Sequence, residues 1–487
     1  MNPLSLRPAA PAGVAPAFPR EPTRPCFLLV RDDAERNENP HASDSYLCHT
    51  ALRMSDESLY RDKLVSAEDA VASVADGSLF TFGAALAEPT AVLWAFANRL
   101  RAGDLQRLRV LSGPSLPGTK ESLLALDLAD RVERCSTFVG AMDRGAVRVG
   151  LDHYLPNHFH QLPRLIADHM QVDVAATTVS PMDRDGFFTF GTSNDFISTA
   201  ARCAKRLIVE VNEFMPRVHG DSRLHVSEVT AVVENHTPLP DFAATVPEPG
   251  DDVIARGILE LVPDGATIQL GVGGLPTVLC GFLTGHRDLG IHTEYLCQGM
   301  IDLVASGVAT GARKTLHPGR HVFTVACGGR PMLDLMNDNP AFESYPVSYT
   351  NHPSVIARNE RMISINSVLE VDLLGQANAE FLLGHQFSGS GGQLDFVRGA
   401  YDAPGGKSIL AFHATARGGT VSRIVPQLSA GTMVTTPRND THYLATEFGV
   451  VNLKGKSTRE RALAIIELAA PQFRDDLLRA AEDMYLL

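Results

Sequence analysis

The chain has 487 residues, of which 44% are hydrophobic types, so it is long enough for two or three packed domains. Its formal net charge is -13 and it holds no Lys- or Arg-rich run, so we expect no nucleic acid partner. No apolar stretch is long enough to cross a bilayer, so we expect no membrane partner either. The seven cysteines are an odd number without a C-x-x-C pair, which argues against a disulfide framework and favours a cytoplasmic location.

Residues 1–55 differ in composition from the rest of the chain. An acidic cluster at Asp32, Asp33 and Glu35 argues against a transit peptide. We predict a disordered N-terminal extension, and Met54 is an alternative start of the globular part. The prolines that follow one another closely in this stretch are Pro3, Pro8, Pro11, Pro16, Pro19, Pro22 and Pro25.

The chain contains an internal repeat. Residues 76–93 and 264–279 each read as a turn, a short strand, a loop of small residues and a helix with Pro in its first turn. A largely apolar helical segment precedes each copy, at residues 67–75 and 253–261. These features predict an α/β fold of two related halves, with mainly parallel sheets and crossover helices.

Residues 234–251 are rich in Pro and Gly and have little apolar periodicity, so we interpret them as a linker. We therefore predict an N-terminal domain over residues 56–240 and a C-terminal domain over residues 250–487. Near the C-terminus, Ser457 and Glu460 have the spacing of a capping box, which predicts a surface helix.

The two copies of the repeat differ in the loop after the strand. The first copy has Ala84-Ala85-Leu86 where the second has Val272-Gly273-Gly274. Only the second loop has lost enough side chains for backbone amides to approach a ligand closely. We expect the C-terminal half to bind the phosphate-bearing or reacting group, and the N-terminal half to shape the other substrate.

Several familiar motifs fail in this sequence. Pro404–Ser408 ends like a P-loop, but Tyr401 stands where the first glycine is required. Gly271–Pro276 begins like a dinucleotide fingerprint, but a proline takes the third glycine position. No serine lies in a G-x-S-x-G elbow, and His158 and His160 lack a further ligand at metal-binding spacing. We expect neither a serine hydrolase triad nor a metal.

Glu294 is a carboxylate whose sequence position lies between two glycine clusters, Gly271–Leu275 and Ser388–Phe396. By residue type alone, a lone Glu at a strand end is usually an exposed or capping carboxylate. Its apolar flanks favour a place in a site, where loop amides supply the electrostatics that a carboxylate nucleophile needs to attack an activated acyl group. Cys297 is a rival nucleophile, for which a buried structural thiol is the favoured interpretation.

A set of segments spread over the chain carries a family resemblance: Lys63–Glu68, Val179–Asp183, Asn212–Arg217, Gly271–Pro276, Leu289–Glu294, Lys314–Gly319, Ser388–Gly399 and Gly418–Pro426. Together they resemble the acetyl-CoA hydrolase/transferase family, in the branch of the 4-hydroxybutyrate and butyrate:acetate CoA-transferases. The resemblance runs from about Leu59 to the C-terminus. It implies two CoA-transferase-like α/β halves with the active site in the cleft between them.

The resemblance also implies a reaction and its residues. CoA would move from an acyl-CoA such as acetyl-CoA to a short-chain carboxylate such as 4-hydroxybutyrate or butyrate, by a ping-pong mechanism. The family's catalytic glutamate matches Glu294, which would form a glutamyl–acyl anhydride and then a glutamyl-CoA thioester. Lys407 is a candidate for the CoA phosphates, and Arg398, Lys454 and Lys456 are further candidate cations. The remaining candidates for binding CoA or the oxyanion are Gly271, Val272, Gly273, Gly274, Leu275, Gly391 and Gly392.

Two other functions stay open at this point. In an acyl-CoA hydrolase, water rather than a carboxylate would resolve the glutamyl intermediate, and a non-catalytic acyl-CoA-binding protein would have lost the reaction. The chain departs from the family pattern at Gln298, His413 and Asn452, so the resemblance does not fix the carboxylates. We expect CoA and acyl-CoA as substrates, no permanently bound cofactor, and a homodimer or higher homo-oligomer.

Overall fold

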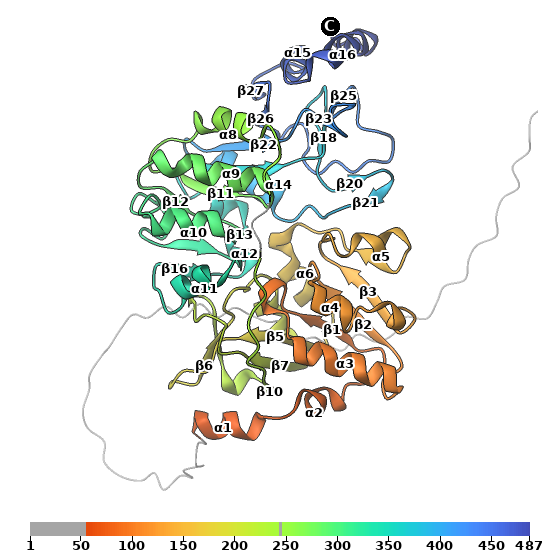
Figure 1. Ribbon diagram of the computed structural model, residues 1–487, viewed down its shortest axis with the longest axis vertical. Helices are drawn as coiled ribbons and strands as arrows, with labels where there is room; N and C mark the ends of the chain where they lie inside the picture. The colour runs from red at the N-terminus through yellow and green to blue at the C-terminus, as the bar shows by residue number, and fades with distance from the viewer. Residues whose placement is uncertain (1–54, 243–245) are drawn as a thin grey trace, which may run out of the picture. The chain divides into compact units, whose positions relative to one another are not determined.

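The computed structural model describes residues 55–242 and 246–487, so the predicted N-terminal extension lies outside the described residues except for Ser55. The described residues belong to one compact unit. Figure 1 shows this unit as an N half (residues 55–242), coloured red to yellow-green, and a C half (residues 246–487), coloured green to blue. The prediction of an α/β fold with two halves and mainly parallel sheets is confirmed.

The N half is built on a seven-stranded sheet with the strand order β10-β7-β5-β1-β2-β3-β4. Every neighbouring pair in this sheet is parallel, as the crossover helices require. The strands are β1 (Leu79–Phe82), β2 (Leu108–Ser112), β3 (Val132–Ser136), β4 (Asp152–Tyr154), β5 (Val174–Val179), β7 (Arg206–Val211) and β10 (Ala231–Glu234).

Helices cover both faces of this sheet. Phe80 and Phe82 of β1 point to one face and pack with α2 (Ala67–Ala72) and α3 (Thr90–Ala102). Leu79 points to the other face and packs with α6 (Leu162–His169) and α7 (Ile197–Cys203), because successive strand residues alternate. The remaining helices of this half are α1 (Asp56–Lys63), α4 (Pro117–Glu121) and α5 (Arg144–Arg148).

The C half has a six-stranded sheet with the order β12-β11-β17-β22-β26-β27, in which only the β26–β27 pair is antiparallel. Its strands are β11 (Thr267–Leu270), β12 (Gly290–Ile291), β17 (Met362–Ser367), β22 (Lys407–Ala411), β26 (Tyr443–Thr446) and β27 (Gly449–Asn452). One face packs on α8 (Asp251–Leu259), α9 (Gly274–Phe282), α10 (Gln298–Ala305) and α11 (Arg330–Met336). The other packs on α14 (Gln393–Asp402), α15 (Thr458–Glu467) and α16 (Pro471–Asp483).

Short elements complete the fold and join the halves. A three-stranded sheet, β14-β16-β8, combines β8 of the N half with two strands of the C half. The short helices of the C half are α12 (Val347–Thr350) and α13 (Pro353–Ile356). The short strands are β6 (Phe187–Thr189), β8 (His219–Gly220), β9 (Arg223–His225), β13 (Tyr295–Cys297), β14 (His321–Phe323), β15 (Val325–Cys327), β16 (Phe342–Ser344), β18 (Glu370–Asp372), β19 (Ala377–Asn378), β20 (Phe381–Leu382), β21 (His385–Gln386), β23 (Thr415–Ala416), β24 (Val421–Ser422) and β25 (Ile424–Val425).

The internal repeat corresponds to β1–α3 in the N half and β11–α9 in the C half. The helical segments expected before each copy are α2 and α8. Pro276 lies in the first turn of α9, which begins at Gly274, so the prediction is confirmed for this copy. It is slightly wrong for the other copy, because Pro89 is the N-cap of α3 and precedes its first turn. The capping box of Ser457 and Glu460 is present at the start of α15.

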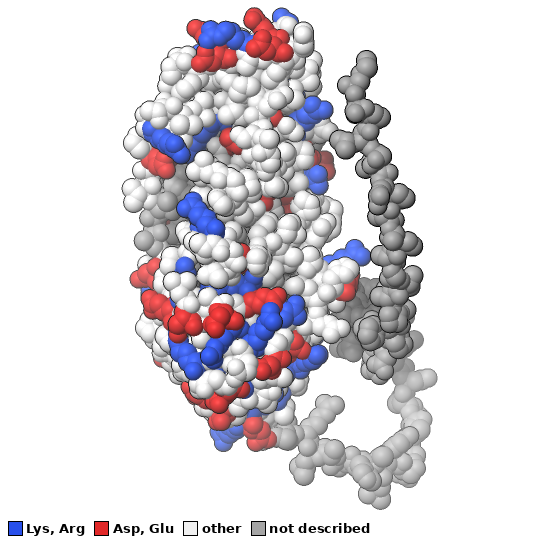
Figure 2. All heavy atoms as spheres, turned by 90° about the vertical axis from the view of Figure 1, so that its right-hand side faces the viewer, with Lys and Arg blue, Asp and Glu red and all other residues white. Residues whose placement is uncertain are grey.

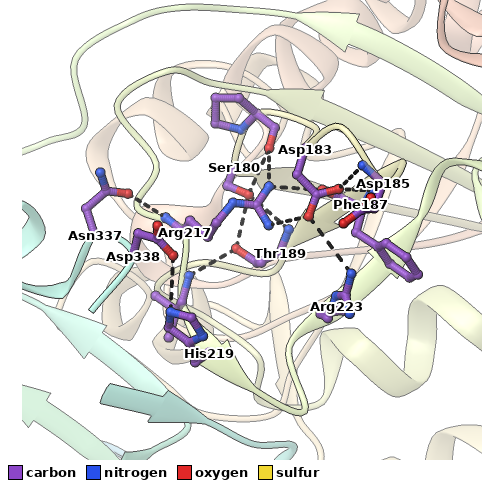
Figure 3. Close-up of polar contacts among 12 residues, drawn as sticks. Ser180, Asp183, Asp185, Phe187, Thr189, Arg217, His219, Arg223, Asn337 and Asp338 are labelled. Carbon is purple, nitrogen blue, oxygen red and sulfur yellow. Dashed lines mark hydrogen bonds and ion pairs between the residues drawn. The ribbon is translucent and has the colours of Figure 1, made fainter. Parts of the chain in front are cut away.

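A polar cluster around Arg217 ties the two halves together (Figure 3). Its guanidinium donates to Asp183 Oδ2 at 3.0 Å and to the carbonyls of Pro181 and Phe187 at 2.8 and 3.0 Å. The Arg217 backbone N–H donates to Asn337 Oδ1 of the C half at 2.9 Å. The segments Val179–Asp183 and Asn212–Arg217, singled out in the sequence, therefore contain residues whose hydrogen bonds hold the two halves together.

Lys and Arg side chains alternate with Asp and Glu over the lower part of the face shown in Figure 2. That face carries no extended region of one sign, in keeping with the absence of basic runs in the sequence. In the described part of the chain, no helix combines the length and apolarity needed to cross a membrane.

Candidate functional site

Glu294 lies in a bend between β12 and β13. Its carbonyl oxygen accepts hydrogen bonds from the N–H groups of Thr324 (3.3 Å) and Val325 (2.9 Å), where β14 passes into β15. The two neighbours of Glu294 are also joined to each other, because Thr293 Oγ1 donates to the Tyr295 carbonyl at 3.0 Å. The backbone is thus fixed around Glu294, which limits the directions its side chain can take.

Two donors hold the Glu294 carboxylate. They are Asn351 Nδ2, directly after α12, and the backbone N–H of Gly392, the N-cap of α14. A Cβ added at Gly392 would overlap both Glu294 Oε2 and Asn351 Nδ2, so only glycine fits at this position. The close approach expected of a glycine loop is therefore present, and it is made to the protein's own carboxylate.

The electrostatic setting makes Glu294 more basic than an ordinary glutamate. Burial raises its pKa from 4.5 to about 7, and the carboxylates of Asp395 and Asp195 act in the same direction. The hydrogen bonds from Asn351 and Gly392 oppose this shift because they favour the charged form. The ionised form of Glu294 is therefore a stronger base than the anion of an unperturbed glutamate.

The N half contacts or contributes the two acidic residues that act on the Glu294 pKa, Asp395 and Asp195. Asp395, in the first turn of α14, accepts from the His160 backbone N–H at 3.1 Å, and its Oδ1 lies 2.7 Å from His160 Nδ1. The segment around Asp195 runs along β15, since Ser193 forms an isolated bridge with Val325. Burial raises the pKa of Asp195 to about 6. Both halves therefore set the charge around Glu294.

Glu294 opens into a cavity of about 400 Å³. Most of its lining comes from the C half and the end of the linker, and the N half contributes Phe138. The second glycine loop is docked on the N half, because Ser390 Oγ donates to the Asn157 carbonyl at 2.8 Å. The sequence-predicted residues that line this cavity are Gly271, Val272, Gly273, Gly274, Leu275, Glu294, Gly391 and Gly392.

The N-terminus of α9 faces this cavity without a side-chain cap. The loop before it, Gly271–Gly273, lines the cavity, and Val272 is 66% exposed. Gly273 has a φ of 140°, which a residue with a side chain rarely adopts. A helix N-terminus with unpaired N–H groups attracts an anion, so this loop offers a place for a negatively charged group of a ligand.

Lys407, the cation that the sequence favoured for the CoA phosphates, does not line the cavity. Lys407 begins β22, whereas the cavity is lined by Ala411 at the other end of that strand, roughly 13 Å away at strand spacing, and by Phe412 and His413 after it. Its Nζ donates to the Leu261 carbonyl at 2.7 Å. We therefore do not retain Lys407 as a contact for the CoA phosphates.

Arg423 is the arginine that sequence reasoning missed. It lines the cavity, and among the described residues no hydrogen bond or ion pair engages its guanidinium. The segment Gly418–Pro426 contained it, but nothing in that pattern separated it from a surface arginine. Of the other candidate cations, Arg398 pairs with Asp440 at 3.1 Å and Lys454 lies over the Tyr401 ring at 3.8 Å, and neither lines the cavity.

Two departures from the family pattern have defined contacts. His413 lines the cavity, and its Nε2 lies 2.9 Å from Asp251 Oδ1, which connects the end of β22 to the start of α8. Gln298 donates to Asp302 Oδ1 at 2.9 Å within α10. In the two described ranges, no group of three or more His, Cys, Asp or Glu side chains is placed to hold a metal ion.

Comparison with protein families gives two matches. The acetyl-CoA hydrolase/transferase N-terminal domain matches residues 49–241, and the C-terminal domain of the same name matches residues 328–481.

Similar sequences are found among CoA-transferases. The chain is 41% identical over 428 residues to succinyl-CoA:cyclohexane-1-carboxylate CoA transferase of Geobacter metallireducens, covering 88% of this chain and 97% of that protein. It is also 41% identical over 426 residues to the 4-hydroxybutyrate coenzyme A transferase of Clostridium kluyveri, covering 87% of this chain and 98% of that protein.

Solved structures show the same fold over nearly their full length. RipA from Yersinia pestis superposes with a TM-score of 0.84 at 48% identity, covering 89% of this chain and 100% of RipA. A 4-hydroxybutyrate CoA-transferase from Porphyromonas gingivalis superposes with a TM-score of 0.74 at 35% identity, covering 88% of this chain and 99% of that structure.

Proposed function

The chain belongs to the acetyl-CoA hydrolase/transferase family and is a CoA-transferase, and from this premise we propose that Glu294 carries CoA between an acyl-CoA and a short-chain carboxylate. The observation that carries the proposal is the Glu294 carboxylate itself, raised in pKa and held by Asn351 and Gly392 where it opens into the cavity. Acetyl-CoA is the proposed donor, and 4-hydroxybutyrate or butyrate the proposed acceptor.

The first step is attack by the ionised Glu294 on the thioester carbonyl. The C–S bond breaks, CoA leaves as a thiolate, and a mixed anhydride joins the acyl group to Glu294. The thiolate then attacks the Glu294 carbonyl of this anhydride, which forms a glutamyl-CoA thioester and releases the first carboxylate. A second carboxylate repeats these steps in reverse and leaves as the new acyl-CoA, so one thioester replaces another and no other energy source is needed.

Each attack creates a tetrahedral oxyanion, which needs donors. In the free enzyme the Gly392 N–H and Asn351 Nδ2 point at the Glu294 carboxylate, so they are suited to an oxygen of Glu294 when its carboxyl carbon is attacked. The amides of Gly271–Leu275 are suited to the substrate's side of the cavity. Losing one such donor typically costs about 3–4 kcal/mol of transition-state stabilisation.

The test traps the intermediate on Glu294. The protein is incubated with acetyl-CoA, reduced with borohydride, and digested for mass spectrometry. A glutamyl-CoA thioester is reducible and a free carboxylate is not, so we expect the reduced residue at position 294. Glu248→Gln is a matched control, because Glu248 also lines the cavity but its side chain is 72% exposed.

Parallel reactions without an acceptor and with a panel of carboxylates measure acceptor dependence. Thioester consumption that needs an added carboxylate supports transfer. Consumption at the same rate in its absence supports hydrolysis by water. Unmodified Glu294 together with unchanged turnover in Glu294→Ala would contradict the mechanism.

A further inference from the structure

His292 is a buried histidine that the transfer mechanism does not use. It directly follows β12, two residues before Glu294, and its exposed fraction is 0%. Its backbone N–H donates to the Ile268 carbonyl of β11 at 3.2 Å, and it forms an isolated bridge with Val322 of β14. Two neighbouring strands therefore fix the position of this histidine relative to Glu294.

The imidazole packs against two elements that lie beside the Glu294 carboxylate. Its Nε2 lies 2.8 Å from the carbonyl oxygen of Thr350, the last residue of α12. The next residue is Asn351, whose Nδ2 donates to Glu294. The imidazole ring also lies 6.3 Å, between ring centroids, from that of Phe396 in α14, the helix that begins at the second glycine loop. His292 thus links the segment before Glu294 to the residue that holds its carboxylate.

The contact with Thr350 determines which nitrogen of His292 carries the proton. A carbonyl oxygen can only accept, so Nε2 must be the donor. Burial lowers the pKa of His292 to about 3, and the charges of Lys314 and His317 act in the same direction, so the ring is neutral and Nδ1 is bare. Nδ1 is buried and has no hydrogen-bond partner among the described residues, which costs stability. An apolar side chain would avoid that cost, so the Nε2–H bond is what the histidine contributes here.

This bond fixes the peptide unit that precedes the Asn351 side chain. The Thr350 carbonyl and the Asn351 N–H belong to one planar peptide unit. The carbonyl accepts from His292, and the N–H donates to the Val347 carbonyl at 3.0 Å, so the unit is held at both ends. Asn351 Oδ1 is buried and has no hydrogen-bond partner in the described part of the chain. The direction of the Asn351 amide towards Glu294 therefore depends on its backbone.

We propose that His292 is a positioning residue for CoA transfer, whose Nε2–H holds the Thr350 carbonyl and thereby keeps the Asn351 amide on the Glu294 carboxylate. The inference rests on the proposed function of Glu294 and extends it to a residue that does not line the cavity. Without this bond the peptide unit can turn at its carbonyl end, and Asn351 Nδ2 moves away from Glu294. A displacement of about 1 Å near a reacting group can cost on the order of 10²-fold in rate.

The experiment compares His292→Leu and His292→Gln in the full-length enzyme, with acetyl-CoA and a carboxylate acceptor. We expect kcat of His292→Leu to fall by about tenfold, and KM to stay within about twofold because His292 does not line the cavity. Its kcat/KM should also begin to fall at a higher pH, because the Asn351 hydrogen bond favours ionised Glu294. His292→Gln should keep at least about half of the turnover and the wild-type pH profile, because a glutamine amide N–H can reach the position of Nε2–H.

A double variant tests whether His292 acts through Asn351. His292→Leu combined with Asn351→Ala should be no slower than Asn351→Ala alone, because the amide that His292 positions is already absent. His321→Leu is the matched control, since it removes another buried imidazole, from β14, whose ring packs on that of Phe342 at 5.3 Å between centroids. It should keep the wild-type turnover per folded molecule and the wild-type pH profile.

Several results would overturn the inference. Wild-type kcat in a folded His292→Leu, or losses that add to those of Asn351→Ala, would show that His292 does not act through Asn351. Equal losses in His321→Leu or in His292→Gln would assign the effect to core packing. If His292→Leu does not fold, His292→Asn replaces it with the same expected results, because the shorter amide falls short of the Thr350 carbonyl.

The Glu294→Gln variant separates this inference from the proposed function. An active Glu294→Gln enzyme contradicts the proposed function itself. An inactive Glu294→Gln enzyme together with an unaffected His292→Leu enzyme contradicts only the role given to His292.

Discussion

The two copies of the internal repeat differ at the N-terminus of their helix, where only one of them is capped by a carboxylate of the protein. In the N half, the Glu210 carboxylate accepts from the N–H groups of Ala91 (2.9 Å) and Val92 (3.2 Å), so the start of α3 is occupied by the protein's own anion. In the C half, no side chain caps α9, and its loop lines the cavity beside Glu294.

The loops before these helices also differ in burial, since the N-half loop is buried and the C-half loop is exposed. Ala84, Leu86 and Ala87 of the N half are all buried, and a Cβ on Gly83 would collide with Thr177. In the C half, Val272 is exposed in the equivalent loop. The N copy thus fills the anion site of its helix with a protein carboxylate, whereas no side chain caps the helix of the C copy, where we propose that a ligand binds.

The largest expected effect is that of Glu294→Gln, which removes the carboxylate beside the C copy of the repeat. We expect transfer to fall by at least about 10³-fold, because the amide is not a nucleophile for the thioester. The initial rate of acyl-CoA consumption with a carboxylate acceptor measures this. Glu248→Gln should stay close to the wild type, and equal losses in both variants would show that the cavity charge, and not Glu294, matters.

Gly392→Ala tests the close approach of the second glycine loop. The added methyl group would overlap the Glu294 carboxylate and Asn351, so we expect turnover to fall by about 10²-fold in a folded protein. Gly281→Ala is the matched control, since a Cβ there meets nothing within 4 Å in α9. A Gly392→Ala enzyme with normal turnover would mean that the carboxylate does not need this position.

The raised pKa of Glu294 predicts how the rate of CoA transfer depends on pH. The ionised form is the nucleophile, so kcat/KM should fall about tenfold for each pH unit below about 7. Asn351→Ala removes a hydrogen bond that favours the charged form, so its profile should shift to higher pH. An unshifted profile in this variant would contradict the role given to Asn351.

The same raised pKa also predicts an effect on stability. Because the folded-state pKa lies above the ordinary value of 4.5, ionising Glu294 disfavours the folded state as pH rises towards about 7. Glu294→Gln should therefore have a higher Tm than the wild type above about pH 7, and the difference should vanish below about pH 4.5. Thermal melts across this range measure it, and a constant difference would contradict the pKa shift.

A smaller effect separates the two candidate cations. Arg423→Ala removes a guanidinium that has no protein partner among the described residues, so we expect KM for acyl-CoA or the carboxylate to rise by about tenfold. Lys407→Ala should leave both KM values within about twofold, because Lys407 contacts the Leu261 carbonyl away from the cavity. The reverse result would restore Lys407 as a ligand contact.

Glu210→Gln tests the N copy of the repeat, in which the Glu210 carboxylate accepts hydrogen bonds at the start of α3. It leaves one or both N–H groups at the start of α3 without an acceptor, so we expect a loss of about 1–3 kcal/mol in the free energy of unfolding. Turnover per folded molecule should not change. Denaturant unfolding measures the first and active-fraction kinetics the second, with the exposed Glu213→Gln as control. A catalytic defect without a loss of stability would break the contrast between the two copies.

The sequence by itself determined the α/β class, the repeat, both glycine loops and the position of Glu294 in the chain. These features depend on local chemistry: the alternation of apolar residues, the backbone freedom of glycine and the turn preferences of proline. The predicted domain boundaries, the oligomeric state and the cytoplasmic location stay predictions, as do the roles of the site residues.

Only the tertiary structure decided which side chains meet. Asn351 is 57 residues from Glu294 in sequence, and His160 is 235 residues from Asp395, so no local pattern could pair them. The same holds for the cations: Lys407 begins β22 and Arg423 lies between β24 and β25, and of these two only Arg423 lines the cavity. Sequence fixes the elements through local preferences, whereas packing and strand order bring distant charges together and exclude water from them.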